Sequence, residues 1–384
     1  MKIVHVISSL SPNLGGLPVA CLNLAANQAK LGHEVTILTQ HIVSDRESQI
    51  FITSVRYHEK INYLSLPYAS NLKYLLDKGH SIMLAVESLQ PNVLHLHGVW
   101  EPFLLYVGRW ALSNKLPYII SPHGMLYPYC LSEKSFKKKI ALKLFYKRFI
   151  DHASALHVLN NDEKDAINSF INKQLVFVAS NGVDDALLEF SEKNNINPSS
   201  QFGVNKPYFL FLGRLHPIKG LDLLLESFGW YVNQGGLYDL ALIGPDGGSL
   251  KSISNWLERN DDIKHRVLMP GSIYGDEKYT WIINSLAYIQ TSKHETFSMS
   301  ITEALALSKP VIITKNCHFP EVAEVGAGFV TDPCPEKISS CMLKIDNSPK
   351  VMEDMGRAGS LLVRKRFQWE RTAADLVTGY SALT

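Results

Sequence analysis

The sequence predicts an α/β protein built from two domains, each with a parallel β-sheet flanked by helices. Three observations carry this prediction. The chain has 384 residues, 46% hydrophobic and 19% charged, which suits well-packed globular domains but is too long for one ordinary core. Short apolar runs alternate with longer helical patterns, the order that gives parallel sheets. The same alternation occurs on both sides of one polar segment.

The first half contains six predicted strands, each followed by a longer helical or polar stretch. They are KIVHVI (2–7), HEVTILTQ (33–40), NVLHLHG (92–98), PYIISPHG (117–124), SALHVLN (154–160) and LVFVAS (175–180). The second half has five, YFLFLG (208–213), DLALIG (239–244), RVLMPG (266–271), LAYIQTS (286–292) and PVIITKN (310–316). This rhythm predicts two sheets rather than a repeat array.

The domain boundary is predicted from composition. The segment FSEKNNINPSSQFGVNKP (190–207) is polar and rich in Asn, Ser and Pro, as expected of an exposed connection. We therefore expect a first domain at 1–190 and a second at 206–367. The final segment FQWERTAADLVTGYSAL (367–383) has the pattern of a helix.

Net charge, cysteine content, the N-terminal segment and the length of apolar runs argue against several classes of protein. A net charge of only +2 gives no support for nucleic-acid binding. The cysteines are odd in number and form no C-x-x-C pair, which favours a reducing compartment; they are Cys21, Cys130, Cys317, Cys334 and Cys341. The opening MKIVHVISSL lacks the features of a signal peptide, and no apolar run approaches 18 residues. We expect a cytoplasmic protein.

The loop LGRLHPIKG (212–220) is the first candidate binding segment. A strand ends here, and Arg214 and Lys219 flank a proline-containing turn before a helix. Two cations beside a helix N-terminus form a site for phosphate, because guanidinium, ammonium and backbone N–H groups all favour negative charge. The alternative is a solvated surface loop with two ordinary basic residues.

The segment HETFSMSITEAL (294–305) places two glutamates eight positions apart, Glu295 before a predicted helix and Glu303 inside it. Their carboxylates could accept hydrogen bonds from different hydroxyl groups of one ligand. The alternative is that Glu303 is exposed to solvent and Glu295 merely balances Lys293.

The helix in this segment starts near Ser298. Either Ser298 or Thr296 is a plausible N-cap, which would leave the N–H groups of Ser298 and Met299 facing an anion. An anion bound at this helix N-terminus would complete the phosphate site predicted for the loop 212–220.

Histidines of the first half require separate consideration. His95 and His97 lie two apart on one strand and share a face, but no third ligand follows at metal spacing, so we interpret them as structural or cleft-lining. His123 precedes Gly124 at the carboxyl end of a strand, where ligands of α/β sheets bind. The chain has no D-x-D triplet, so no metal-bound diphosphate is expected.

A basic segment follows, EKSFKKKIALKLFYKRFI (133–150), with seven Lys and Arg between Lys134 and Arg148. A basic amphipathic helix would suggest a membrane surface or a lipid-linked acceptor. Its apolar residues spread around most of the helix circumference, however, so a partly buried helix with a solvated basic start is preferred.

Taken together, these motifs resemble a known family. GRLHPIKG followed some eighty residues later by ETFSMSITEALA is similar to the retaining GT-B glycosyltransferases of family 4 (glycosyl transferases group 1), whose signature is E-x7-E after a G-R-x-x-x-x-K-G loop. GGLPVACLNLAANQAKLGHEVTILTQ, SPHGMLYPYCL and SNGVD match further segments, so the resemblance covers nearly the whole chain. It implies two Rossmann-like domains facing across a cleft, with the C-terminal helix 368–384 packing back on the first.

The resemblance implies a role for each residue that matches the family's motifs. Arg214 and Lys219 would hold the donor diphosphate, Glu303 the nucleotide ribose, and Glu295 the donor sugar. Gly15 and Gly16 would bring the backbone close to the donor phosphate and the acceptor. Backbone N–H groups around Phe297, Ser298 and Met299 would complete the donor site, and His123 would lie near the reacting sugar. The family commonly has glycine where this chain has Ser298.

The implied reaction moves a glycosyl group from a nucleoside diphosphate sugar to an acceptor hydroxyl with retention, without a tightly bound metal. Relatives carrying SPHGM suggest a bacterial surface polysaccharide pathway, with a saccharide or lipid-linked saccharide as acceptor. Peripheral membrane contact at the inner face is a hypothesis that depends on the basic segment 133–150. Two alternatives stay open. A non-catalytic sugar-nucleotide-binding protein would keep Arg214, Lys219 and Glu303, and a dinucleotide enzyme would need the G-x-G-x-x-G that GGLPVA lacks.

Overall fold

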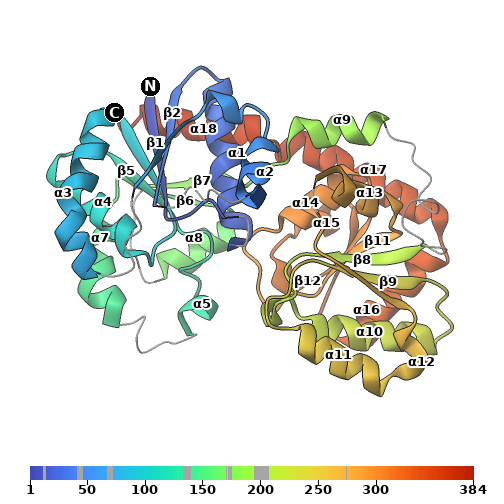
Figure 1. The fold of residues 1–384 in the computed structure, drawn as a ribbon. Coiled ribbons are helices and arrows are strands. Elements are labelled where there is room, and N and C mark those ends of the chain that lie inside the picture. The colour runs from blue at the N-terminus through green and yellow to red at the C-terminus, as the bar shows by residue number, and fades with distance from the viewer. Residues whose placement is uncertain are drawn as a thin grey trace. The chain divides into compact units, whose positions relative to one another are not determined.

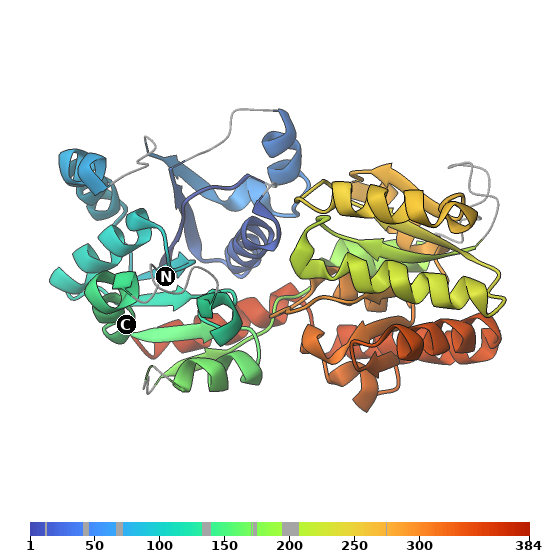
Figure 2. The same ribbon diagram turned by 90° about the horizontal axis from the view of Figure 1, so that it is seen from below.

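The chain folds into two units, each with a parallel sheet that has helices on both faces (Figures 1 and 2). The computed structural model describes residues 1–11, 14–40, 46–66, 72–132, 140–169, 171, 175–193, 207–273 and 275–384. The first unit is Met1–Asn181 with Trp369–Thr384, and the second is Gly182–Gln368. The predicted fold class is confirmed: both sheets are parallel and Rossmann-like.

The first unit alternates strands and helices along the chain. Its strands are β1 (Lys2–Ile7), β2 (Glu34–Thr39), β3 (Asn62–Ser65), β4 (Val93–His97), β5 (Tyr118–Ser121), β6 (Ala155–Val158) and β7 (Val176–Val178). Its helices are α1 (Gly16–Lys30), α2 (Arg46–Thr53), α3 (Leu72–Leu89), α4 (Pro102–Ser113), α5 (Pro128–Ser132), α7 (Lys147–Asp151), α8 (Asn161–Asn168) and α18 (Trp369–Ser381). Short helical turns lie at His58–Lys60 (η2) and Leu142–Tyr146 (η3).

The sheet of the first unit runs in the order β3-β2-β1-β4-β5-β6-β7. Alternation along each strand separates its two faces. Val4, Val6, Leu94 and Leu96 pack into a large apolar core with α3, α4 and α7. Residues at the alternate positions point to the opposite face, against α1 and α18, and include an unusual number of histidines described below.

The second unit repeats the architecture. Its strands are β8 (Tyr208–Leu212), β9 (Asp239–Ile243), β10 (Val267–Gly271), β11 (Ala287–Gln290), β12 (Val311–Thr314) and β13 (Gly328–Thr331). Its helices are α9 (Asp185–Lys193), α10 (Leu221–Asn233), α11 (Leu250–Arg259), α12 (Asp261–Lys264), α13 (Gly275–Asn284), α14 (Met299–Ala306), α15 (Glu321–Glu324), α16 (Pro335–Asp346) and α17 (Pro349–Arg366). Short turns lie at Pro217–Lys219 (η5) and Lys315–Cys317 (η6).

The second sheet runs in the order β10-β9-β8-β11-β12-β13 and buries both faces. One core lies under α10, α11, α12 and α16, and the other under α9, α13, α14 and α17 (Figure 1). Burial on both faces explains why strands such as YFLFL and DLALI are almost wholly apolar.

Two features differ from the sequence prediction. Helix α9 belongs to the second unit, because Leu187 and Leu188 are buried in the core shared with α14, so the boundary falls after Asn181 rather than after 190. Residues 194–206 of the expected connection lie outside the described part of the chain. The edge strands β3 and β13 were not predicted, because they are four residues long and only partly buried or exposed.

Helix α18 belongs to the first unit, although 187 residues of the second unit precede it in sequence. It packs on α1, where Lys30 and Glu370 form an ion pair of 2.7 Å. Among the described residues, no helix combines the length and apolar character needed to cross a membrane.

Candidate functional site

The loops that follow β8, β9 and β11 form the candidate site of the second unit. β8 lies between β9 and β11 in the sheet, so the strand order reverses at this point. In open α/β sheets, ligands bind outside the carboxyl ends of the strands at such a reversal, where loops lead into helix N-termini. Arg214, Lys219, Glu295 and Glu303 all lie in, or directly after, these loops.

The loops after β8 and β11 are in direct contact. Gly220 has φ of +64°, and a Cβ atom at this position would lie 2.1 Å from the backbone oxygen of Thr291. The Thr291 hydroxyl donates to the Gly220 carbonyl at 2.8 Å, and the Lys293 N–H donates to the Ile218 carbonyl at 2.8 Å. Only glycine fits at position 220, because both the positive φ and the close approach exclude a side chain.

Arg214 is exposed, and its stem lies over the loop after β9. A Cβ atom at Gly247 would lie 2.7 Å from Cγ of Arg214, so a glycine is needed beneath the side chain. The loop itself is held by Asp246, whose carboxylate accepts from three backbone N–H groups at the start of α11, and these bonds lower its pKa. Among the described residues, the Arg214 guanidinium has no hydrogen-bond or ion-pair partner, so its charge is available to a ligand.

Lys219 and Glu295 form an ion pair, which the sequence did not predict. Nζ of Lys219 lies 2.5 Å from Oε2 of Glu295, and the two side chains are only 22% and 16% exposed. The alternative in which Glu295 balances Lys293 is wrong, since Lys293 pairs with Asp222 at 3.3 Å. The alternative of a freely solvated Lys219 is also wrong. The cation expected to meet a phosphate is therefore already paired with a carboxylate.

Gln290, at the end of β11, orients this pair. Its Nε2 donates to Oε2 of Glu295 at 2.8 Å, and its Oε1 accepts from the hydroxyls of Tyr288 at 2.7 Å and Ser298 at 2.8 Å. These partners fix which end of the amide faces the carboxylate. Sequence analysis missed Gln290. The only available signal was a polar residue at the end of an otherwise apolar strand.

Ser298 is the N-cap of α14, as one of the two predicted options. Its backbone is extended, and its hydroxyl accepts from the N–H of Ile301 at 3.3 Å. The Ser298 side chain is buried and its hydroxyl donates to Gln290. The serine found here in place of the family's glycine therefore points into the unit. Phe297 packs its ring against Phe319 and Phe367, which leaves its backbone, and that of Met299, as the ligand-facing candidates.

Glu303 lies in α14 and is mostly buried, so the alternative of an exposed Glu303 is wrong. Its Oε1 lies 2.7 Å from Nζ of Lys278 in α13. Burial is the largest single cause acting on Lys278 and lowers its pKa, but Glu303 and Tyr279 together outweigh it, so the pKa of the lysine is raised. Lys278 is a second residue that sequence analysis did not single out, although the segment YGDEKYTWIINSLAYIQTSKHETF, which contains it, also resembles the family.

Gly15 and Gly16, the two glycines expected beside the donor, lie at the start of α1 in the first unit. Gly15 has φ of +82°, and no described atom lies within 4 Å of a Cβ built on either glycine. Among the described atoms, none would obstruct a ligand that approaches the Cα positions of these two glycines. Pro12 and Asn13 of the preceding loop lie outside the described residues.

His123 follows β5 in a strained backbone conformation, with φ of +48°. The turn is held by Glu163 at the start of α8, whose carboxylate accepts from the N–H groups of Gly124 at 2.7 Å and Leu159 at 2.8 Å. Burial raises the pKa of Glu163 to about 7, while the two backbone bonds oppose the shift. Glu163 is a further residue that sequence analysis did not single out.

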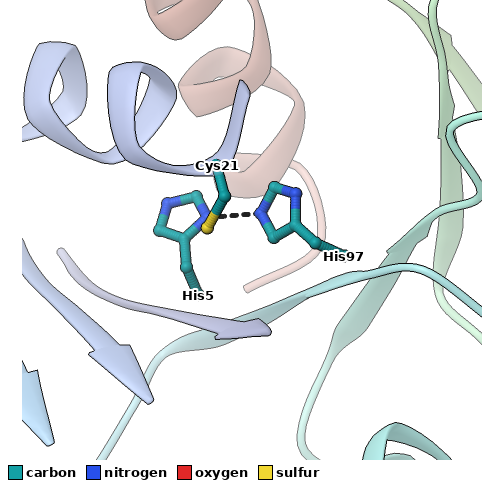
Figure 3. A group of neighbouring side chains, drawn as sticks. All are labelled: His5, Cys21 and His97. Atoms are coloured by element: carbon teal, nitrogen blue, oxygen red, sulfur yellow. Dashed lines mark hydrogen bonds between the residues drawn. The ribbon is translucent and has the colours of Figure 1, made fainter. Parts of the chain in front are cut away.

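His95 and His97 are fully buried on β4 and share a face, as predicted. His5 of β1 and Cys21 of α1 lie beside His97, and one ligand atom from each of the three lies within 4.8 Å of the others (Figure 3). Spacing along the chain could not reveal this group. Hydrogen bonds occupy both ring nitrogens of His5, and burial strongly raises the pKa of the Cys21 thiol. We therefore assign no metal to it.

Two family models match the chain. The model of glycosyl transferases group 1 matches residues 192–361, and that of glycosyltransferase family 4 matches residues 14–187. Together they cover most of the sequence, with one model on each unit.

Relatives along the full length are glycosyltransferases. The chain is 21% identical over 393 residues to the GDP-mannose:cellobiosyl-diphosphopolyprenol alpha-mannosyltransferase of Xanthomonas oryzae pv. oryzae, covering 99% of this chain and 96% of the relative. It is 22% identical over 400 residues to a GDP-mannose-dependent alpha-(1-6)-phosphatidylinositol dimannoside mannosyltransferase of Mycobacterium tuberculosis, covering 100% and 97%.

Among solved structures, the Anabaena protein HepE in complex with UDP-glucose superposes with a TM-score of 0.79 at 18% identity and full coverage of both chains. This likeness establishes the GT-B fold. With a family model on each unit, mannosyltransferase relatives along its whole length and this architecture, the chain belongs to the GT-B glycosyltransferases of family 4.

Proposed function

We propose that this glycosyltransferase moves a hexose from a nucleoside diphosphate sugar to an acceptor hydroxyl with retention at the anomeric carbon. The observation that carries the proposal is the set of charges at the strand-order reversal of the second unit. An Arg214 that has no partner in the described part of the chain and a Lys219–Glu295 pair lie on loops that also present the N-terminus of α14. Such a set suits a ligand that carries phosphate and sugar hydroxyls together.

Arg214 and Lys219 act on the leaving group. When the glycosidic bond to the diphosphate breaks, negative charge builds on the phosphate oxygens and the sugar becomes oxocarbenium-like. Cations and helix N–H groups held in place before the reaction stabilise that charge where it develops. The backbone of Phe297, Ser298 and Met299 completes this cradle. The departing phosphate takes the acceptor proton in a front-face reaction.

Glu295 and Glu303 bind the two ends of the donor. Glu303, fixed by Lys278, accepts from the ribose hydroxyls, and Glu295, fixed by Gln290, accepts from hydroxyls of the transferred sugar. Because Lys219 is already paired with Glu295, an incoming diphosphate competes for its ammonium group. That competition loosens Glu295 at the moment the sugar arrives.

His123, Gly15 and Gly16 act from the first unit. His123 lies near the reacting sugar, and the open helix start at Gly15 and Gly16 lets backbone approach the donor phosphate and the acceptor. Protein cations carry the diphosphate charge, so we propose that no tightly bound metal is required.

The donor and the pathway follow from the relatives' chemistry. Two relatives use GDP-mannose and act on lipid-linked acceptors, and the solved neighbour holds UDP-glucose. We therefore place GDP-mannose and UDP-glucose first among candidate donors, and a lipid-linked saccharide of a bacterial surface polysaccharide first among acceptors.

The experiment that tests the function is binding and slow hydrolysis across UDP-, GDP-, ADP- and CMP-sugars, with EDTA present. One donor is expected to bind and turn over undiminished by the chelator. Binding without turnover, with or without acceptor saccharides, would favour the non-catalytic alternative. Lack of binding to every sugar nucleotide would contradict the assignment of both motifs.

Glu295→Gln is expected to separate binding from turnover. Without the carboxylate, Lys219 is free to meet the diphosphate, so affinity for the nucleoside diphosphate rises by about five- to tenfold. Turnover falls by about a hundredfold or more, because the sugar loses a charged hydrogen-bond acceptor. Isothermal titration and single-turnover rates measure the two effects. Asp222→Asn, which removes an exposed partner of Lys293, is the matched control and should change neither.

Peripheral membrane contact is the second proposal, carried by the basic segment. In its described part, Tyr146, Phe149 and Ile150 are buried, whereas Leu144 and Phe145 are 63% and 43% exposed. Residues 133–139, which hold three consecutive lysines, lie outside the described residues. Exposed apolar side chains beside a cationic run suit an anionic membrane surface.

Flotation with vesicles containing anionic phospholipid tests this contact. The protein is expected to float with anionic vesicles at low salt and to stay behind with neutral ones. Leu144→Ser with Phe145→Ser should abolish flotation while leaving donor hydrolysis intact. Equal behaviour of both vesicle types would contradict the proposal.

A further inference from the structure

A continuous chain of hydrogen bonds runs through the first unit beneath His123. It begins at a backbone carbonyl after β7, crosses the face of the sheet covered by α1 and α18, and ends at the carboxyl edge. Each donor–acceptor distance is between 2.6 and 3.3 Å. In order, its members are the Ala179 carbonyl, His157, Ser121, His95, Tyr380, Gln28, His5, His97 and His123.

The direction of the chain is fixed at its first member. The Ala179 carbonyl can only accept, so Nε2 of His157 carries a hydrogen and donates to it at 2.8 Å. A neutral imidazole has one donor and one acceptor, so Nδ1 of His157 accepts from the Ser121 hydroxyl at 2.7 Å. Ser121 has thereby used its only hydrogen, and it accepts from Nε2 of His95 at 2.6 Å.

The direction then passes through helices α18 and α1. Nδ1 of His95 accepts from the Tyr380 hydroxyl at 2.6 Å, which leaves the tyrosine oxygen to accept from Nε2 of Gln28 at 3.3 Å. The amide orientation of Gln28 follows, and its Oε1 accepts from Nε2 of His5 at 2.7 Å.

The last two steps reach the edge of the sheet. Nδ1 of His5 accepts from Nε2 of His97 at 2.9 Å, the bond drawn in Figure 3. Nδ1 of His97 in turn accepts from Nε2 of His123 at 3.1 Å. Nδ1 of His123 is left without a hydrogen, and it has no hydrogen-bond partner within the described ranges. One carbonyl thus determines the tautomer of five histidines.

The derivation requires that these histidines are neutral, and their surroundings support this. Burial is the largest cause in every case and lowers each pKa below its ordinary value, and repulsion from neighbouring rings adds to the effect at every one except His157. The five are His5, His95, His97, His123 and His157. A second proton on His5, His95, His97 or His157 would place two donors against each other, because both ring nitrogens of these four are already in hydrogen bonds.

We propose that this chain holds His123 with its hydrogen on Nε2 and presents Nδ1 as an acceptor for a ligand hydroxyl, with Tyr380 and Gln28 as remote positioning residues. The tautomer of His123 follows from the hydrogen bonds described above. That the bound hydroxyl belongs to a sugar rests on the proposed function. An unprotonated ring nitrogen attracts a hydroxyl hydrogen and repels a phosphate or carboxylate oxygen. The chain therefore selects what His123 can bind.

Tyr380 is the member whose loss is most informative. If Tyr380 loses its hydroxyl, His157, Ser121 and His95 remain connected to the Ala179 carbonyl. Gln28 loses its connection to that carbonyl, because it donates to the Tyr380 hydroxyl. The Gln28 amide can then flip and donate to His5, and every bond from Gln28 to His123 can reverse with no donor or acceptor lost. His123 would then carry its hydrogen on Nδ1 and become a donor.

Nitrogen-15 NMR of histidine side chains in the full-length protein tests the proposal. Two-bond couplings distinguish Nε2–H from Nδ1–H imidazoles, and single substitutions assign the signals. In the wild type, all five histidines are expected as neutral Nε2–H tautomers. An Nδ1–H signal for His123 in the wild type would overturn the proposal without any variant.

Tyr380→Phe and Tyr118→Phe form a matched pair. Tyr118 also carries a buried hydroxyl in the first unit, donating to the Phe149 carbonyl at 2.6 Å, but it is not part of the chain. Tyr380→Phe is expected to shift His5, His97 and His123 toward Nδ1–H and leave His95 and His157 unchanged, whereas Tyr118→Phe leaves all five unchanged. Unaltered tautomers in a folded Tyr380→Phe protein would overturn the positioning role.

Kinetics separate this proposal from the proposed function. With an active donor, Tyr380→Phe is expected to lower kcat about tenfold with little change in KM, and Tyr118→Phe to alter neither. An unchanged kcat in a variant with reversed tautomers would overturn the ligand-facing role of His123. If no donor is ever found, the expected wild-type tautomers would still support the chain while the transferase proposal fails.

Discussion

Replacing Arg214 by alanine is expected to lower the rate of donor turnover by about a hundredfold or more, equivalent to about 3 kcal/mol in the barrier. Among the described residues, the guanidinium has no hydrogen-bond or ion-pair partner, and we propose that it binds the donor phosphates. Lys219, in contrast, is already neutralised by Glu295 at 2.5 Å. Arg214 therefore supplies a larger share of the uncompensated positive charge that meets the leaving diphosphate.

The measurement is kcat and KM for donor hydrolysis and transfer, together with affinity for the free nucleoside diphosphate. Both affinity and turnover should fall, because the diphosphate is bound in the ground state and carries more charge in the transition state. Arg259→Ala, an exposed arginine at the end of α11, is the control and should behave as wild type. Normal turnover in Arg214→Ala would contradict the assignment of this loop to the phosphates.

The first unit is expected to lose stability steeply as pH falls from about 6.5 toward 4. Burial lowers the pKa of His5 and of His157 from 6.5 to about 4. Between pH 6.5 and 4, these two histidines are protonated in the unfolded chain but stay neutral in the folded unit. Acidification through this range therefore lowers the free energy of unfolding by on the order of 3 kcal/mol for each of the two histidines. His95, His97 and His123 act in the same direction.

One group opposes this trend. The pKa of Glu163 is raised from 4.5 to about 7, so the folded unit binds a proton that the unfolded chain has released, and acidification through this window favours folding. The opposing effect is on the order of 3 kcal/mol. The combined effect of the histidines is larger than that of the single carboxylate. The net loss is a large part of the free energy of unfolding of a typical protein, which is about 5–15 kcal/mol.

Pulse proteolysis in urea, with fragments assigned to each unit by mass spectrometry, measures this effect at pH 7.5, 6 and 5. The urea midpoint of the first unit is expected to fall far more than that of the second. His5→Asn should make the pH dependence shallower, because one proton fewer is taken up on unfolding, while His265→Asn, at an exposed site in the second unit, should not. Parallel loss of stability in the two units would contradict the prediction.

Local pattern determined much of the fold. Each unit has buried strands that are short apolar runs, and the alternation with helices implies parallel sheets regardless of sequence family. Ser298 could be predicted as an N-cap because capping depends on neighbours within one turn. The strands β3 and β13 could not, because they lie at or near sheet edges and have little apolar signal of their own. Helix α9 was placed in the wrong unit because its apolar residues do not reveal which core they enter.

By itself, the sequence determined the two-unit α/β architecture, and it singled out the loop with Arg214 and Lys219, which we propose binds phosphate, and the acidic segment with Glu295 and Glu303. These depend on contiguous residues and on their order along the chain. Only the tertiary structure decided the partners of those charges, because Lys219 meets Glu295 across two loops and Glu303 meets Lys278 across two helices.

The same holds for the histidine chain. His5 and His97 are 92 positions apart, and Tyr380 and His95 are 285 apart, yet both pairs are in hydrogen-bond contact. His5, His95, His97 and His157 stand at alternating positions of apolar strands, a pattern visible in the sequence but uninformative one strand at a time. Strand order and the return of α18 to the first unit bring them together, and hydrogen-bond direction is a property of the whole chain of contacts rather than of any one residue.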